Sequence, residues 1–516
     1  PVGRGPGHGV RARRGGGVDH RGQGAAGASA AEGPPECDEK KTPGLIEAFD
    51  ALWEQTRAAF VQERTWRRAR TLALSALVGL GRRTVTGMLM ASAQQGLDWT
   101  AAYRLFAQER FDAERLFAPA LGSVLARLGD EEPLVVLMDD TLIRKRGRKI
   151  HGAAWKRDPL GPPFCNNFIW AQRFVQLSAA LPEQLGASRA RAIPVDWHHS
   201  PLPPKPKKKA PDEQWKTYGE LQKTMKVSGV GAERIAALRD QMNRQGQGER
   251  NLVIAVDGTF TNKTVFRALP DKTVAVGRLR KDARLYAVPA QEAGPRRGRK
   301  RFYGEPLQSP EQMRQDPSIP WCQVEAWASG TLQRFEIKTL APVRWKGTGE
   351  IDVRVMAIRP LAYRPRKGAK LLYRDPVYLV CSDPELPLQK LLQAYVWRWE
   401  IEINFRDEKT VLGVGEAQVR TATAVQAVSS FVVAAYTFLL LAASQNGPVA
   451  LPLPKWRHCE PAQRDSTPRL MGALRAQLWG KALGVNLTHV VKPHEGKMTR
   501  FQIADPLPSA VCYAFR

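Results

Sequence analysis

The chain has 516 residues, of which 78 are Lys or Arg and 50 are Asp or Glu, so its formal net charge is +28 at pH 7. A hydrophobic content of 43% and a charged content of 25% are ordinary for a globular protein, and they exclude a wholly disordered or collagen-like chain. The length allows roughly two to four domains. The excess of positive charge favours a polyanionic partner, either nucleic acid or an anionic membrane surface.

Cysteine and histidine spacing indicates neither a disulfide framework nor a zinc site. The cysteines are widely separated and include no Cys-x-x-Cys pair, so we expect reduced thiols in a cytoplasmic protein. The histidines lack zinc-binding spacing, and any metal is therefore expected to have carboxylate ligands. The cysteines are Cys37, Cys165, Cys322, Cys381, Cys459 and Cys512.

The first part of the chain divides into two regions. Residues 1–41 are rich in Gly, Arg, Ala and Pro, which predicts a disordered extension rather than a secretory signal. Residues 42–130 carry apolar side chains at helical spacing, as in Leu45, Phe49 and Leu52, and we expect a helical DNA-binding domain there. Its basic segment 64–70 is a candidate DNA-contacting surface, although an ordinary solvated helix face explains that segment equally well.

After Pro133 the pattern predicts an α/β catalytic core made of residues 131–281 and 388–445. Three closely spaced apolar runs predict an antiparallel meander. A Pro/Lys-rich connection, a helical stretch that is interrupted near Gly229–Gly231, and two more strands follow. This order is compatible with a ribonuclease-H-like fold. The strand-like runs are Leu134–Met138, Phe168–Leu181, Ala192–Val195, Leu252–Val256 and Thr273–Leu279, and the helical stretch is Asp212–Asn243.

The remaining regions are an insertion, two helices and a C-terminal segment. Residues 282–387 combine strand-like runs with basic loops such as 296–301, which predicts a β-rich insertion. A helix is expected from Leu388 to about Leu412. The most apolar stretch, Val425–Ala443, approaches the length of about 20 residues that spans a bilayer, but its internal Gln and Ser residues favour a buried core helix. Residues 446–516 are expected to form a less regular C-terminal region.

Two apolar runs end in aspartate. Asp139, Asp140 and Thr141 follow the first run, and Asp257, Gly258 and Thr259 follow the fourth. A carboxylate at the end of a buried strand lies where a sheet meets a cleft, and it is costly to bury there unless it is paired or metal-bound. The simpler alternative, an aspartate that caps a turn or a helix, remains open for each of them.

A stripe of chemically different polar side chains lies on the helix after residue 388. At 100° per residue, Tyr395, Arg398, Glu402 and Lys409 share an arc of about 60°. On the same wheel Glu400 and Glu408 face away. Two strand-end aspartates and one helical glutamate would suffice to hold two divalent ions for phosphodiester cleavage. Arg398 and Lys409 would bind flanking phosphates, and Tyr395 would donate a hydrogen bond to another phosphate oxygen.

The spacing Tyr395-x2-Arg398-x3-Glu402-x6-Lys409 resembles the Tyr-Arg-Glu-Lys signature of bacterial insertion-sequence transposases of the Asp-Asp-Glu (DDE) superfamily. The resemblance covers about Leu134 to Leu440, and the long separation of Asp257 from Glu402 is expected for members with a β-rich insertion. It implies Asp139, Asp257 and Glu402 as the catalytic, metal-binding acids, with Tyr395, Arg398 and Lys409 as DNA phosphate contacts.

The same resemblance implies the reaction and its partners. Two Mg²⁺ or Mn²⁺ ions would support cleavage of double-stranded DNA at terminal inverted repeats and transfer of the 3′-hydroxyl to target DNA. A homodimer would form on the DNA, in the bacterial cytoplasm at the nucleoid. The carboxylate cage makes a membrane partner unnecessary. A domesticated DNA-binding protein that keeps the fold, or a two-metal nuclease without strand transfer, are the alternative functions.

Some assignments within the resemblance stay open. The family often has Asp-x-Thr at the first acid, which selects Asp139, but Asp140 is adjacent and would point to the opposite face of the strand. Trp321, Trp327 and Trp345 are candidates for stacking on a base flipped out of the transposon end, although core packing explains each of them as well. The basic loop with Lys145, Arg146, Arg148 and Lys149 is a candidate for positioning phosphates.

Overall fold

The computed structural model describes residues 44–514, except for residues 160, 163, 165–166, 185–186, 290–300, 367, 448, 450, 452–463, 485–486 and 488–505. All described residues belong to one compact unit, Pro43–Arg516. The predicted N-terminal extension and residues 296–300 of the basic loop lie outside the described residues. The three described cysteines, Cys322, Cys381 and Cys512, are free thiols.

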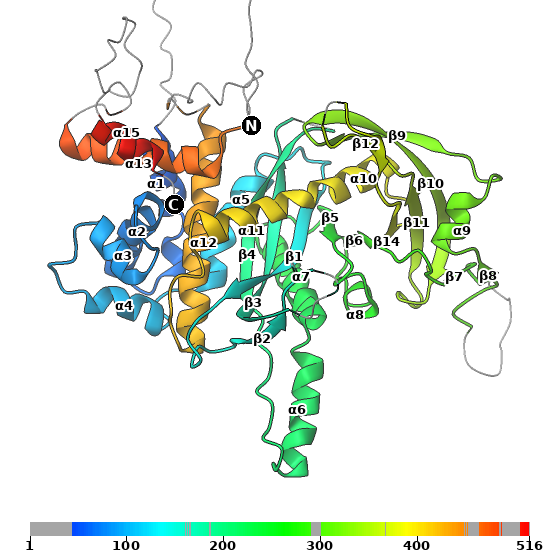
Figure 1. The fold of residues 1–516 in the computed structure, drawn as a ribbon, viewed down its shortest axis with the longest axis horizontal. Helices are drawn as coiled ribbons and strands as arrows, with labels where there is room; N and C mark the ends of the chain where they lie inside the picture. Colours follow the sequence, from blue (N-terminus) through cyan, green and yellow to red (C-terminus); the bar gives the residue numbers. More distant parts are fainter. Residues whose placement is uncertain are drawn as a thin grey trace, which may run out of the picture. The chain divides into compact units, whose positions relative to one another are not determined.

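A central mixed sheet forms the middle of this unit (Figure 1). β3 pairs antiparallel with β1 and with β4, whereas β5 runs parallel to β1 and β6 runs parallel to β5. The spatial order is therefore β4-β3-β1-β5-β6, with the short β2 on the N-terminal part of β3. The predicted meander and the two later strands are confirmed. The strands are β1 (Leu134–Arg144), β2 (Ala154–Arg157), β3 (Phe168–Pro182), β4 (Ala190–His199), β5 (Leu252–Val256) and β6 (Thr273–Arg278).

Helices cover both faces of this sheet, as the buried parallel strands β1 and β5 require. Asp139 lies opposite Gln176, and Gln176 lies opposite Trp197, so their side chains share one face. The helices α10 (Leu388–Trp397) and α11 (Trp399–Thr410) pack there. Asp196 precedes Trp197 and points to the other face, where it pairs with Arg234 of α7 (Val227–Arg244). The short α8 (Lys263–Phe266) connects β5 to β6.

Most of the β-rich segment extends the same sheet, and only β12 and β13 form a separate two-stranded sheet. β14 pairs antiparallel with β6, and β11, β10 and β9 follow in order. β6 would otherwise be an unpaired edge strand, and the added strands satisfy its backbone groups. The elements are β7 (Leu285–Tyr286), β8 (Pro306–Leu307), α9 (Pro310–Gln315), β9 (Cys322–Ala328), β10 (Thr331–Trp345), β11 (Asp352–Ile358), β12 (Ala362–Tyr363), β13 (Leu372–Tyr373) and β14 (Val377–Cys381).

The N-terminal helices surround α12 (Ala422–Gln445), drawn in orange in Figure 1. The ring of Trp53 contacts Phe431 and Phe438 of α12 edge-on. Among the described residues, α12 is the helix long and apolar enough to cross a membrane, but it is 83% buried inside the unit, which confirms the predicted core helix. The N-terminal helices share one hydrophobic core with the sheet. They are α1 (Leu45–Glu54), α2 (Glu63–Val78), α3 (Val85–Ala91), α4 (Thr100–Ala107) and α5 (Ala113–Leu125).

The C-terminal region is more regular than its sequence indicates. α13 (Thr467–Leu483) packs against α1 and α2, and α15 (Pro506–Tyr513) packs against α13. The guanidinium of Arg475, buried in α13, donates to the carbonyl of Val78. The described part of this region therefore completes the helical layer around α12.

The predicted helix 212–243 is divided earlier than expected. α6 (Asp212–Thr224) ends before Lys226, and Gly229 and Gly231 lie inside α7. A Cβ on Gly231 would lie 2.6 Å from the ring of Phe260, so this glycine allows close packing rather than a break. α6 buries no side chain and extends away from the rest of the unit (Figure 1). The lysines before it, from Lys205 to Lys209, are exposed, as expected for a solvated connection.

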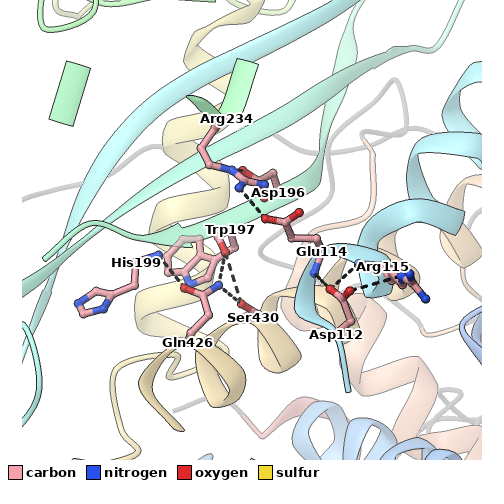
Figure 2. A network of polar contacts seen from close by, with 9 residues as sticks. All are labelled: Asp112, Glu114, Arg115, Asp196, Trp197, His199, Arg234, Gln426 and Ser430. Carbon is pink, nitrogen blue, oxygen red and sulfur yellow. Dashed lines mark hydrogen bonds and ion pairs between the residues drawn. The ribbon is translucent and has the colours of Figure 1, made fainter. Parts of the chain in front are cut away.

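Polar contacts fasten β4 to helices on both sides (Figure 2). Nε and Nη2 of Arg234 donate to the two carboxylate oxygens of Asp196 at 2.8 and 3.0 Å, and Nη1 reaches Glu114 of α5 at 2.6 Å. The charges of both acids hold the pKa of Arg234 above its ordinary value, although burial opposes them. On the α12 side, Gln426 donates to the carbonyl of Trp197 at 2.7 Å and accepts from the amide of His199 at 2.8 Å.

Arg234→Met is expected to lower the free energy of unfolding by about 3–5 kcal/mol, because it leaves the buried Asp196 carboxylate without its partner. Glu114→Gln is the matched control, since the Glu114 side chain is 60% exposed and such pairs contribute about 1 kcal/mol or less. Chemical denaturation of both variants measures the difference. Equal losses in the two variants would contradict a dominant role for the Asp196 pair.

Candidate active site

Asp139 lies in β1, directly after its buried apolar run. Its Oδ1 accepts a hydrogen bond from the backbone amide of Asp140 at 2.8 Å, and its Oδ2 accepts one from Nη1 of Arg398 at 3.2 Å. The Asp139 side chain is 17% exposed. Burial, and next the charge of Asp257, raise its pKa to about 7. Asp139 is therefore a largely desolvated acid beside a second acid and a cation.

Asp257 is the first residue after β5, and β5 is the strand next to β1 in the sheet. Its Oδ1 accepts from the amide of Thr259 at 2.8 Å, and its Oδ2 accepts from the hydroxyl of Thr259 at 3.0 Å. Asp257 thus stabilises the turn, as the simpler alternative proposed. It is also close enough for its charge to raise the pKa values of both Asp139 and Glu402. The two roles coexist, because β1 and β5 are adjacent and parallel, and Asp139 and Asp257 directly follow their last paired residues, Met138 and Val256.

The predicted helix over residues 388–412 is present but locally irregular at Arg398. α10 and α11 meet there, and the backbone amides of Arg398 and Ile401 donate to carbonyls three residues earlier, those of Tyr395 and Arg398. This tighter turn does not separate the predicted stripe, because Nη2 of Arg398 still lies 3.8 Å from Oε1 of Glu402. The local irregularity and the shared face are therefore compatible.

Arg398 bridges two of the predicted acids. Its guanidinium lies between Asp139 of β1 and Glu402 of α11, and only 8% of the residue is exposed. Its charge lowers the pKa values of both carboxyls, against the effect of burial. The rings of Tyr395 and Trp399 flank the guanidinium, with centroids 5.8 and 5.5 Å from Cζ. Three of the four stripe residues therefore meet beside Asp139. This aspartate lies in the middle of β1, because the strand continues to Arg144 and does not end at the apolar run as predicted.

Lys409, the fourth stripe residue, lies further along the helix and near Asp140. Burial lowers the pKa of Lys409, while Glu408, Asp140 and Asp158 raise it. Nε of Arg173 lies 3.2 Å from Oδ2 of Asp140. The two adjacent aspartates thus have different partners, and Asp139 is the one that contacts the stripe through Arg398.

Two cations beside Asp140 were not singled out from the sequence. Arg173 lies in β3, diagonally across from Asp140, and Lys156 lies in β2. The Nζ of Lys156 is buried and has no hydrogen-bond partner among the described residues, and burial lowers its pKa to about 8. Only the strand register could have indicated these neighbours. The sequence around a cation in a strand does not show which residue of the next strand lies beside it.

Glu400 faces away from the acids, as predicted, and pairs with Arg464 at 2.7 Å. Glu408 is buried beside Gln176, and burial raises its pKa to about 8. Among the described residues, neither carboxyl oxygen of Glu408 nor Oε1 of Gln176 has a well-formed hydrogen bond, but Gln176 is close enough to lower the pKa of Glu408 against the effect of burial. A proton on Glu408 would let this carboxyl group donate to the amide oxygen.

Glu408→Gln is expected to raise stability at alkaline pH by about 3 kcal/mol or more and to have little effect at pH 5. The folded-state pKa of Glu408 is near 8, above its ordinary 4.5, so wild-type stability falls as pH rises through this window. Thermal unfolding midpoints at pH 5 and pH 8 measure the effect. Glu400→Gln should lack this pH trend, and the same trend in both variants would contradict the assignment to Glu408.

The carboxylate set suits a hard divalent cation. Asp139, Asp257 and Glu402 supply only oxygen donors. Burial is the main cause of the raised pKa values of Asp139 and Glu402, and the negative charge of Asp257 raises both further. The positive charge of Arg398 partly compensates the negative charge of Asp139 and Glu402. No group of three His, Cys, Asp or Glu side chains in the described part of the chain is close enough together to hold a metal ion. Coordination of one ion by all three acids therefore requires the carboxylates to come closer together and Arg398 to leave them.

A cavity of about 1080 Å³ opens beside the Asp257 turn. Gly258 and Thr261 line it on one side. Its charged lining is mixed, because Arg280 pairs with Asp282 and Arg314 pairs with Glu311, and the other charged lining residues are Arg278, Lys281 and Asp375. Trp345 is the one of the three candidate tryptophans that lines this cavity, and its ring packs edge-on against Phe266. Trp321 instead lies against Lys338 and Arg359, and the backbone amide of Trp327 donates to Gln393.

The predicted basic surfaces divide into paired and exposed cations. Nζ of Lys145 donates to the carbonyls of Gly415 and Ala417, and burial lowers its pKa to about 8. Lys145 is therefore a structural tether and not a free phosphate contact. Arg146, Arg148 and Lys149 are exposed or nearly so. In the segment 64–70, Arg67 pairs with Glu63 and Arg70 pairs with Asp50.

Comparison with known proteins gives one family. A family model described as DDE superfamily endonuclease matches residues 58–345, which is more than half of the chain. The matched region contains Asp139 and Asp257 and ends before α10 and α11, so it does not extend to Glu402. No curated protein shows a significant match to this sequence.

Proposed function

The chain belongs to the DDE superfamily endonuclease family, and we propose that it is a DNA transposase that cleaves phosphodiester bonds at transposon ends and transfers the freed 3′-hydroxyl to target DNA. The family implies an enzyme that acts on DNA. The observation that carries the finer proposal is the convergence of Asp139 and Glu402 on Arg398, with the charge of Asp257 acting on both acids.

The order of the elements supports a ribonuclease-H-like core. Three antiparallel strands, α7, β5, the short α8 and β6 follow one another, and the helices α10 to α12 come later. This is the sequence of elements expected for that fold. β1 and β5 present Asp139 and Asp257 at one edge, and α11 brings Glu402 to it. The long insertion leaves this arrangement intact because it pairs with the far side of β6.

In this proposal Asp139, Asp257 and Glu402 hold two divalent ions, Mg²⁺ or Mn²⁺. Bound there, the ions would activate the attacking oxygen and stabilise the leaving oxygen. The protein contributes the position of each carboxylate: the turn hydrogen bonds orient Asp257, the Asp140 amide orients Asp139, and α11 orients Glu402. Burial of Asp139 limits the competing interaction with water.

Tyr395, Arg398 and Lys409 are proposed to contact DNA phosphates. Arg398 presents a fork that suits a phosphate bidentately once it leaves the two carboxylates. Lys409 provides a point charge further along α11. The cavity beside Asp257, whose lining includes Arg278 and Lys281, would receive the DNA on the other side of the acids. Trp345 in that cavity is the candidate for stacking on a displaced base.

The test uses a supercoiled plasmid that carries the inverted repeats flanking the coding region. The purified protein is incubated with it and with Mg²⁺, Mn²⁺ or EDTA, and target DNA is added. Metal-dependent cleavage at the repeat ends followed by joined products supports the transposase. Cleavage without joining indicates a two-metal nuclease, and DNA binding without cleavage indicates a domesticated DNA-binding protein.

The proposal also includes the assembly and its location. A DNA transposase holds two ends at once, so we propose a homodimer on DNA, within the bacterial cytoplasm at the nucleoid. The net charge of +28 is consistent with a nucleic-acid partner. Light scattering of the protein with and without end DNA measures the assembly. A protomer that remains single on end DNA would contradict this part of the proposal.

A further inference from the structure

Aromatic side chains lie unusually exposed on the hairpin formed by β2 and the start of β3. Trp155 is 66% exposed and Phe168 is 55% exposed. Trp155 lies directly opposite Trp170, and Arg157 lies directly opposite Phe168. The two tryptophan rings are 5.7 Å apart, edge to face. We call the strand pair Ala154–Arg157 and Phe168–Trp170 the aromatic arm.

The register places these side chains in one patch. Directly paired residues share a face, and so do residues two apart along a strand. Trp155, Arg157, Phe168 and Trp170 therefore lie on one face of the arm. Nε1 of Trp170 donates to the carbonyl of Gly147 at 3.1 Å, which holds that ring in place. The ring of Trp170 is thus held in place, and the exposed ring of Trp155 packs against it.

The aromatic arm lies on the same edge and face of the sheet as Asp139. Gln176 is directly opposite Asp139, and the strand spacing puts Trp170 about 20 Å away along β3. That distance corresponds to about six nucleotides of DNA at 3.4 Å each. Because Trp170 and Gln176 are an even number of residues apart, the patch and Asp139 face the same side.

The positive charge around the aromatic arm favours a nucleic-acid partner. Between residues 141 and 171 basic side chains far outnumber the single acid, Asp158. Arg146, Arg148 and Arg157 are exposed. Exposed tryptophan among cations matches the chemistry of nucleobases on a phosphate backbone, since aromatic rings stack on any base and cations neutralise the phosphates. An apolar protein partner would not require this excess of positive charge.

We propose that the aromatic arm is a stacking platform for unpaired nucleobases, located about six nucleotides from the cleavage point. The inference rests on the proposed function in one respect, namely that the partner is DNA. Trp155 and Phe168 would stack on bases of a single strand, while Arg157 would contact its backbone. The arm would thereby hold the strand that is separated near the acids.

The test measures binding of two DNA probes by fluorescence anisotropy in EDTA, which prevents cleavage. One probe is a 30-base-pair duplex, and the other is a fork of the same sequence with an unpaired arm of eight nucleotides. Wild type should bind the fork more tightly. Trp155→Ala and Phe168→Ala should each weaken fork binding roughly 5- to 150-fold and change duplex binding by less than about twofold, whereas Trp155→Phe should retain fork binding.

Tyr373→Ala is the matched control, because Tyr373 has the same exposure as Trp155, 66%, but lies in β13, outside the arm. It should bind both probes like wild type, and thermal midpoints check that all variants are folded. The proposal is overturned if Trp155→Ala weakens both probes equally or neither, or if it instead dissolves an oligomer in sedimentation. If wild type binds the duplex without preferring the fork, the proposed stacking platform is wrong but the proposed DNA function stands. If wild type binds neither probe, the DNA function fails with it.

Discussion

Glu402→Gln is expected to abolish DNA cleavage, with a loss of about 10³-fold or more, while DNA binding is retained. The substitution keeps the size of the side chain but removes one of the carboxylates proposed to hold the divalent ions, whose transition-state stabilisation amounts to several kcal/mol. Glu402 is accessible, since its side chain is 44% exposed, and it is 3.8 Å from Arg398. Plasmid nicking rates measure cleavage, and gel shifts with the same DNA measure binding.

Glu400→Gln is the control for this result. Glu400 is on the same helix and carries the same charge, but it pairs with Arg464 on the other side. Its loss of activity should be within about fivefold, as for an interaction that supports packing and not chemistry. Equal losses in the two variants would contradict the assignment of one face of α11 to the active site.

Asp139→Asn is expected to reduce cleavage by about 10³-fold as well, whereas Asp140→Asn should reduce it by about tenfold or less. Asp139 contacts Arg398 on the face of α11, and Asp257 acts on it as its strongest neighbouring charge. Asp140 points to the opposite face, where Arg173 is 3.2 Å away. Each variant removes one negative charge, and the two positions are adjacent. A difference in activity between the two variants therefore reports the position of the carboxylate and not the loss of charge.

Cleavage rates of both variants should be measured with Mg²⁺ and with Mn²⁺, together with thermal midpoints. Asp140→Asn leaves Arg173 and the buried Lys156 without their carboxylate, so a stability loss is expected there and must be separated from activity. A larger activity loss for Asp140→Asn at equal folding would make Asp140 the first acid and would overturn the assignment of Asp139.

Periodicity was sufficient to predict the local arrangement of the candidate site. The alternation within β1 distinguished the faces of Asp139 and Asp140, and the 3.6-residue period of α11 separated Glu402 from Glu400. These patterns depend only on backbone geometry within a few residues, so they can be predicted without the tertiary structure. The irregular turn at Arg398 did not alter them, because it spans less than one turn of helix.

Other features were beyond local pattern. Lys145 reads as a free loop cation but donates to Gly415 and Ala417, more than 250 residues along the chain. Glu408 reads as a solvated charge but lies buried beside Gln176 of β3. In both cases the surroundings come from distant segments, and burial decides the charge state through desolvation.

The sequence by itself determined which residues follow the buried apolar runs, which share a helix face and how much positive charge the chain carries, since each depends on neighbours along the chain. Only the tertiary structure decided that Arg398 lies between Asp139 and Glu402, that the β-rich segment continues the sheet beyond β6, and that aromatic rings remain exposed on the arm. Those features arise from contacts between segments far apart in sequence, whose energies depend on register, burial and the proximity of charges.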